Sequence, residues 1–334
     1  MTLTLLLPDA IPYGELFLAG ALPRLPALEL LLARGARLRK PGLALEEWLL
    51  DTWNVHDCAV APLTLLADGG EPAASTWLRA DPVLLRFEGK HIRLLDHHHF
   101  DLETAEADSL IESLNRHFAQ DGIAFMSPQP KRWYARIPSD DLPLATPLWK
   151  VAGKSILEHL PQSQGRRDWK ALANEIQMLL FDHPVNAARE SRGAPAVNAV
   201  WLWGAGGLPA ATVKPFNLIL SDLPLARGLA MNSRAVIRPL APAFAAFSST
   251  EDSVLIVLHQ LTKILRTGDA DSLSPALTRI EEDWIVPALA ALRNGQIDTL
   301  RLCLPSQTVT LDCRIRRSDL LKFWRRPRAL AAYA

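Results

Sequence analysis

The most informative stretch of this 334-residue chain runs from His183 to Gly206 and reads HPVNAARESRGAPAVNAVWLWGAG. Its last third places Trp201 and Trp203 beside Gly204 and further glycines. This pattern predicts a buried strand that runs into a glycine-rich turn, where the backbone approaches another group closely. We therefore expect the end of the segment to be a strand followed by a loop at a site.

The first part of the same segment carries polar side chains three residues apart: His183, Asn186, Arg189 and Arg192. On helical turns this spacing puts all four side chains on roughly one side. Arginine guanidinium groups bind phosphate or carboxylate oxygens in a bidentate way. The pattern predicts either an anion pocket or a structural polar cluster that satisfies backbone groups where two domains meet, and the spacing leaves both open.

The whole segment resembles the corresponding segment of archaeal-type, cofactor-independent phosphoglycerate mutases of the alkaline phosphatase superfamily. Over nearly its full length the chain is also similar to shorter bacterial proteins, the RpfE-type regulatory proteins, which carry segments like WLRADP at 77–82 and FWRRPR at 323–328. The resemblance implies pocket or interdomain roles for His183, Asn186, Arg189, Asn198 and Trp203. Arg192 joins this candidate ligand-binding set on spacing alone.

The resemblance also implies the fold. We expect an α/β protein with an alkaline phosphatase-like core, whose mostly parallel sheet has helices on both faces, and a smaller inserted α+β domain. Apolar runs at 3–7, 218–220, 254–258 and 300–304 fit core strands separated by helices. A hairpin around Glu88-Gly89-Lys90 and a helix over 105–121 fit the insert. We place the core at 1–60 and 195–334 and the insert at 61–194.

Charge and cysteine content limit the classes of function. Lysine plus arginine equals aspartate plus glutamate at 36 each, so no global field favours nucleic acid or an anionic membrane surface. Cys58, Cys303 and Cys313 lack metal-type spacing, which fits a reducing compartment. The apolar start is interrupted at Pro8, too early for a signal peptide or a membrane span. We expect a cytoplasmic protein that binds neither membranes nor nucleic acid.

Active members of the superfamily hold two metal ions and a serine nucleophile. Asp9 and His259 follow predicted strands and match two of the ligand positions that the resemblance implies. No serine precedes Ser75, and Pro305-Ser306-Gln307-Thr308 stands where the family has an aspartate–histidine pair. We therefore regard Asp9 and His259 as vestigial ligands. We predict no catalytic residue, no metal site and no cofactor.

Two local clusters are interpreted as solvated surface. The run Asp96-His97-His98-His99 follows a hairpin strand, and consecutive side chains on an extended chain point to alternate sides, which argues against a metal site. Alternation at 309–315 predicts a terminal strand followed by a short helix, and we place the arginines of 314–328 on the solvated face.

The sequence thus indicates a non-catalytic phosphoglycerate mutase-like protein with a regulatory or ligand-sensing role. Its expected partners are a small phosphorylated or carboxylated molecule and another protein. One alternative is a metal-dependent mutase or phosphatase that recruits ligands from the insert. Another is a protein-interaction module that uses the basic C-terminal region.

Overall fold

The computed structural model describes residues 1–11, 22–56, 59–138, 142–160, 162–163, 167–210 and 213–333. Its internal contacts divide the chain into a discontinuous unit, residues 1–54 with 212–334, and a continuous unit, residues 55–211. Cys58 lies outside the described residues. Cys303 and Cys313 are buried, free thiols in the discontinuous unit.

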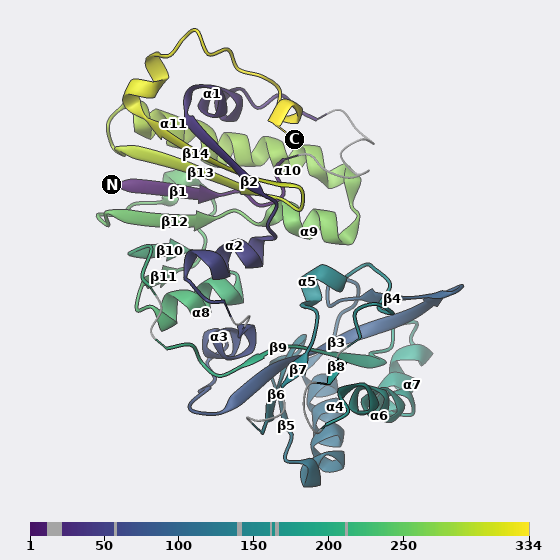
Figure 1. The fold of residues 1–334 in the computed structure, drawn as a ribbon. Coiled ribbons are helices and arrows are strands. Elements are labelled where there is room, and N and C mark those ends of the chain that lie inside the picture. Colours follow the sequence, from purple (N-terminus) through teal and green to yellow (C-terminus); the bar gives the residue numbers. More distant parts are fainter. Residues whose placement is uncertain are drawn as a thin grey trace. The chain divides into compact units, whose positions relative to one another are not determined.

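The discontinuous unit contains a seven-stranded sheet in the order β11-β10-β12-β1-β13-β14-β2 (Figure 1). Five neighbouring strands, from the β11 edge to β13, are parallel: β1 (Thr2–Leu6), β10 (Leu218–Leu220), β11 (Val236–Arg238), β12 (Ser253–Val257) and β13 (Thr299–Pro305). Two antiparallel strands complete one edge: β14 (Val309–Arg316) and β2 (Ala36–Pro41). The expected α/β class with a mostly parallel sheet is confirmed.

Helices cover both faces of this sheet. Leu3 and Leu5 of β1 pack in one apolar cluster with α1 (Pro26–Arg34), α10 (Leu273–Ile280), a π-helical turn (Glu281–Ile285) and α11 (Val286–Arg293). The connection from β12 through α10 and α11 to β13 leads toward one edge of the sheet. The connection from β10 through α8 (Pro224–Asn232) to β11 leads toward the other edge. Because such crossovers are right-handed, α8 and its neighbour α2 (Leu45–Thr52) lie on the other face.

The continuous unit has an antiparallel sheet centred on the long strand β3 (Thr76–Glu88). The other strands are β4 (His91–Leu95), β5 (Ala124–Gln129), β6 (Arg132–Ile137) and β9 (Ala199–Gly206), with β7 (Pro143–Leu144) and β8 (Gln162–Ser163) forming a separate pair. On one face the sheet packs against α4 (Thr104–His117) and α6 (Trp169–Phe181). On the other face it packs against α3 (Val60–Ala67).

The predicted hairpin joins β3 to β4, and the predicted helix over 105–121 corresponds to α4 and the 3₁₀ turn Ala119–Asp121. Asp168 caps α6 by accepting hydrogen bonds from two backbone N–H groups, and Gly122 adopts a left-handed conformation after the turn that ends α4. The domain boundaries differ from those expected. Strand β9 pairs with β3 over Ala199 to Gly206, so residues 195–211 belong to the continuous unit and not to the core.

The remaining helices are α5 (Leu148–Val151), α7 (Pro184–Ser191) and α9 (Gln260–Thr267), with short 3₁₀ turns between elements. In the part of the chain that the structure describes, no helix has both the length and the apolar character to cross a bilayer.

Candidate functional site

Helix α7 presents the polar residues of the 183–206 segment on one face, as their spacing predicts. His183 caps the helix: its Nδ1 accepts a hydrogen bond from the N–H of Val185 at 3.2 Å, and its Nε2 lies 2.9 Å from the Ser113 hydroxyl. Burial lowers the pKa of His183, which favours the neutral imidazole. Asn186 and Arg189 are the buried residues of α7.

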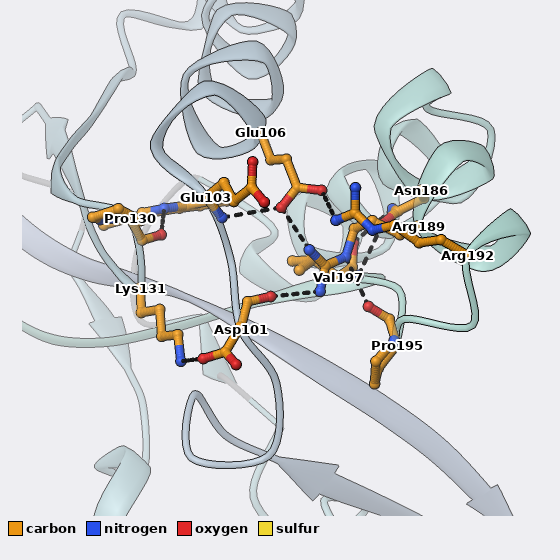
Figure 2. Close-up of polar contacts among 11 residues, drawn as sticks. Asp101, Glu103, Glu106, Pro130, Lys131, Asn186, Arg189, Arg192, Pro195 and Val197 are labelled. Carbon is orange, nitrogen blue, oxygen red and sulfur yellow. Dashed lines mark hydrogen bonds and ion pairs between the residues drawn. The ribbon is translucent and has the colours of Figure 1, made fainter.

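Arg189 is the centre of this cluster, and its side chain is only 1% exposed. Each guanidinium nitrogen donates to an oxygen of the same unit: Nε to Pro195 O at 2.8 Å, Nη1 to Glu106 Oε2 at 2.6 Å and Nη2 to Asp101 O at 2.6 Å (Figure 2). Arg192 pairs with the other oxygen of Glu106 but is half exposed. These contacts are those expected of a structural polar cluster, and an anion pocket here stays a prediction.

The side chains of two asparagines in this segment form hydrogen bonds with backbone groups. Asn186 donates to Leu180 O at 2.7 Å and to Val197 O at 2.8 Å, and it accepts from Val197 N at 2.9 Å. Asn198 makes a reciprocal pair with the backbone of Leu85, at 2.8 and 2.9 Å. Both amides therefore replace missing backbone partners.

The carboxylate of Glu106 makes the stability of this cluster depend on pH. Burial alone would raise its pKa, but hydrogen bonds from the Glu103 N–H and Arg192, together with the charges of Arg189 and Arg192, lower it below the usual 4.5. A carboxylate with a lowered folded-state pKa stabilises the fold above its unfolded pKa, and this stabilisation is lost as pH falls through the folded value.

We therefore expect the continuous unit to lose stability as pH falls below 4.5. The Glu106→Gln variant should be less stable near neutral pH and should show a shallower loss on acidification. Urea unfolding at a series of pH values measures both effects, and hydrogen exchange of α4 and α7 assigns them to this part of the unit. An unchanged acid dependence in the variant would contradict the assigned role of Glu106.

Trp203 belongs to a different polar network. Val200 and Leu202 of β9 pack toward α4 and α6, so by strand alternation Trp203 faces the opposite side of the sheet. There its indole N–H donates to Asp81 Oδ2 at 2.7 Å. The structure therefore does not place Trp203 among the contacts of Arg189.

The partner of Trp203, Asp81, is fully buried and forms an ion pair with Arg79, which is itself buried. The Arg79 guanidinium lies over the rings of Tyr134 and Trp203, at 5.3 and 5.2 Å from their centroids. Burial raises the pKa of Asp81, and the charge and hydrogen bond of Arg79 oppose that rise. This pair was not predicted, although it lies within the WLRADP segment.

In the discontinuous unit, Asp9 follows the central strand β1. Its backbone is in the left-handed region, with φ 60°, and its N–H donates to Pro305 O at 2.8 Å. Its carboxylate accepts a hydrogen bond from the Thr262 hydroxyl at 2.7 Å. His259 precedes α9, one helical turn before Thr262, and burial lowers its pKa.

The stretch after β13 forms the tight turn that leads into β14. The Ser306 hydroxyl donates to Val309 O at 2.8 Å, and the backbone N–H of Ser306 donates to the same oxygen at 3.0 Å. Ser306 is fully buried. This hydroxyl thus closes a hairpin in the stretch where the resemblance led us to look for metal ligands.

Among the described residues, one group of three His, Cys, Asp or Glu side chains has ligand atoms within 4.8 Å of one another, and it is Asp96, His97 and His98. The chain turns here instead of running extended, because Asp96 is buried and accepts from the His98 N–H at 3.1 Å. The alternation that we expected for 96–99 is therefore wrong. Asp9 and His259 belong to no such group among the described residues.

No family model matches the chain. A curated relative from Methanosarcina barkeri, a 2,3-bisphosphoglycerate-independent phosphoglycerate mutase, is 28% identical over 258 residues, which cover 70% of this chain and 64% of the relative. The enzyme of the same name from Methanothrix thermoacetophila is 24% identical over 203 residues, 54% of this chain and 51% of the relative. The chain is similar to phosphoglycerate mutases.

A further relative, phosphoglycerate mutase 2 of this type from Methanothermobacter thermautotrophicus, is 31% identical over 136 residues, 37% of this chain and 31% of the relative. The chain spans less than two thirds of the length of these mutases.

Among solved structures, a cofactor-independent phosphoglycerate mutase from Thermoplasma acidophilum covers 94% of this chain and 89% of its own, with 14% identity and a TM-score of 0.43. A protein from Pyrococcus horikoshii covers 94% and 87%, with 12% identity and a TM-score of 0.49. These scores are too low to carry a functional assignment.

Proposed function

We propose that this phosphoglycerate mutase-like protein does not catalyse the mutase reaction and acts through binding, in a regulatory or ligand-sensing role. The observation that carries the proposal is the polar chemistry at the ends of the parallel strands. There Asp9 is hydrogen-bonded to Thr262, and Ser306 closes a hairpin turn.

In-line phosphoryl transfer by two metal ions needs cations about 4 Å apart, each held by several hard ligands. In the described part of the discontinuous unit, Asp9 and His259 are the remaining residues of the expected set. A carboxylate and one imidazole leave most coordination positions of two cations unfilled. The residues present therefore do not fit a two-metal centre.

The hydroxyl residues available as a nucleophile also argue against the mutase reaction. No serine precedes Ser75, and Thr52, a hydroxyl residue in that part of the chain, is the last residue of α2, so no helix N-terminus activates it. A hydroxyl without an adjacent base or metal is a weak nucleophile. This supports a protein that has kept the scaffold without the chemistry.

The test is a phosphoglycerate mutase assay with added Mn²⁺ or Zn²⁺, with elemental analysis of protein purified without chelator. We expect turnover at background level and substoichiometric metal, while an active archaeal mutase assayed in parallel converts the substrate. Metal-dependent turnover that Asp9→Asn or His259→Gln abolishes would contradict the proposal. That result would establish the alternative, a mutase or phosphatase with rearranged ligands.

A further inference from the structure

A second part of the discontinuous unit has the features of a ligand site. A cavity of about 690 Å³ lies between the C-terminal segment and the junction of α1 with β2. Its chemistry comes from Arg37, Trp324, Arg325, Arg326, Arg328 and Tyr333. We call it the C-terminal cavity. Its volume is in the range of small-molecule sites, about 300–1,000 Å³.

The lining is strongly basic although the whole chain has a net charge of zero. Arg325 is used structurally, since its Nη1 donates to the carbonyls of Arg34 and Gly35 at 3.3 and 3.1 Å, at the C-terminus of α1. Within the described residues, Arg37, Arg326 and Arg328 have no ion pair with a carboxylate. Three guanidinium groups without a carboxylate partner among the described residues thus line one cavity.

Tyr333 supplies an independent observation. Its side chain is buried, with the residue only 7% exposed, and its ring lies under the Arg37 guanidinium at 5.3 Å. Its hydroxyl has no hydrogen-bond partner in the part of the chain that the structure describes. An unsatisfied buried hydroxyl costs about 1–3 kcal/mol, so it is expected where a ligand or water completes the site.

Trp324 adds an aromatic surface to the same cavity. The residue is 66% exposed, and its neighbour Phe323, which meets it edge to face at 5.3 Å, is 78% exposed. Exposed aromatic rings beside guanidinium groups are the combination that stacks on a planar ring while arginines hold its phosphate.

We propose that the C-terminal cavity binds a small anion that carries a planar ring, of the class of the nucleoside phosphates. Arg37, Arg326 and Arg328 contact the phosphate oxygens, and Trp324 stacks on the ring. A free small molecule is favoured over a nucleic acid because the site is one cavity and the chain as a whole carries no excess of positive charge. The site shares no residue with the strand ends, so it holds whether or not the protein has mutase activity.

The test is isothermal titration calorimetry of the full chain with ATP, AMP, adenosine and inorganic phosphate. We expect ATP and AMP to bind more tightly than either phosphate or adenosine alone. Arg326→Ala and Arg328→Ala should each weaken ATP binding about tenfold. Trp324→Ala should weaken AMP binding and leave phosphate binding unchanged.

The matched control is Arg227→Ala, which removes an exposed arginine of α8 and should leave binding unchanged. All these side chains are exposed, so the variants should unfold at the wild-type temperature. An absence of heat with every nucleotide, or equal weakening by Arg227→Ala, would overturn the proposal. Tighter binding of a single-stranded oligonucleotide than of ATP would also overturn it, because it would assign the surface to nucleic acid.

Discussion

Replacing Arg189 by alanine should lower the free energy of unfolding of the continuous unit by about 3–5 kcal/mol. The change leaves the Glu106 carboxylate without its buried partner and leaves two carbonyls, of Asp101 and Pro195, without a donor. Both losses occur where water has little access, because Arg189 is 1% exposed. Hydrogen exchange of α4 and α7, measured on the whole chain, reports the loss in this unit alone.

The matched control is Arg192→Ala, which removes the second cation of the same carboxylate. Arg192 is 48% exposed, so its loss should cost only about 0–1 kcal/mol. Near-wild-type stability in Arg189→Ala, with weakened binding of a phosphorylated molecule, would contradict the structural role. It would support the anion pocket instead.

Replacing Asp81 by alanine should destabilise the continuous unit by a similar amount, about 3–5 kcal/mol. Arg79 would then be a buried charge without a counter-ion, and the indole N–H of Trp203 would lose its acceptor. Urea unfolding, followed by hydrogen exchange of β3 and β9, measures the effect. The neighbouring Asp68–Arg132 pair keeps its own two hydrogen bonds, each at 2.5 Å, so it should remain intact.

Removing the charges of both Arg79 and Asp81 tests whether the unpaired charge causes the destabilisation. The double variant Arg79→Met with Asp81→Leu fills the space with apolar groups and should be far more stable than Asp81→Ala alone. A double variant as unstable as the single variant would show that packing, and not the uncompensated charge, dominates. Asp81→Asn should fall between them, since the amide oxygen still accepts from Trp203.

The sequence predicted β1, β10, β12 and β13 because each is a continuous, buried apolar run. It did not predict the fifth parallel strand, β11, in which Val236 and Arg238 are exposed. It did not predict β2, whose six residues are all exposed and include Arg37, Arg39 and Lys40. That strand forms because β14 offers it a partner, over Ala36–Pro41. Helix α3 was missed for the opposite reason, since it is buried on nearly all sides and shows no amphipathic period.

The candidate site was only partly predictable. The three-residue spacing correctly placed Asn186 and Arg189 on one face of α7, because that is local geometry. Their partners could not be inferred, since Glu106 is 83 residues from Arg189 in sequence. The Arg79–Asp81 pair lies at strand positions that share a face, but the contact with Trp203 depends on the β3–β9 register.

The position of β1 in the middle of its sheet has a consequence for synthesis of the chain. Leu3 pairs with positions 254 and 300 on the two neighbouring strands, so both partners leave the ribosome long after β1 does. Residues 55–211 form a continuous unit that can fold during this interval. The apolar segment at 3–7 must therefore stay unpaired without aggregating while more than half of the chain is made. Early apolar strands of this kind are natural clients of chaperones, because their partner strands follow much later in the chain.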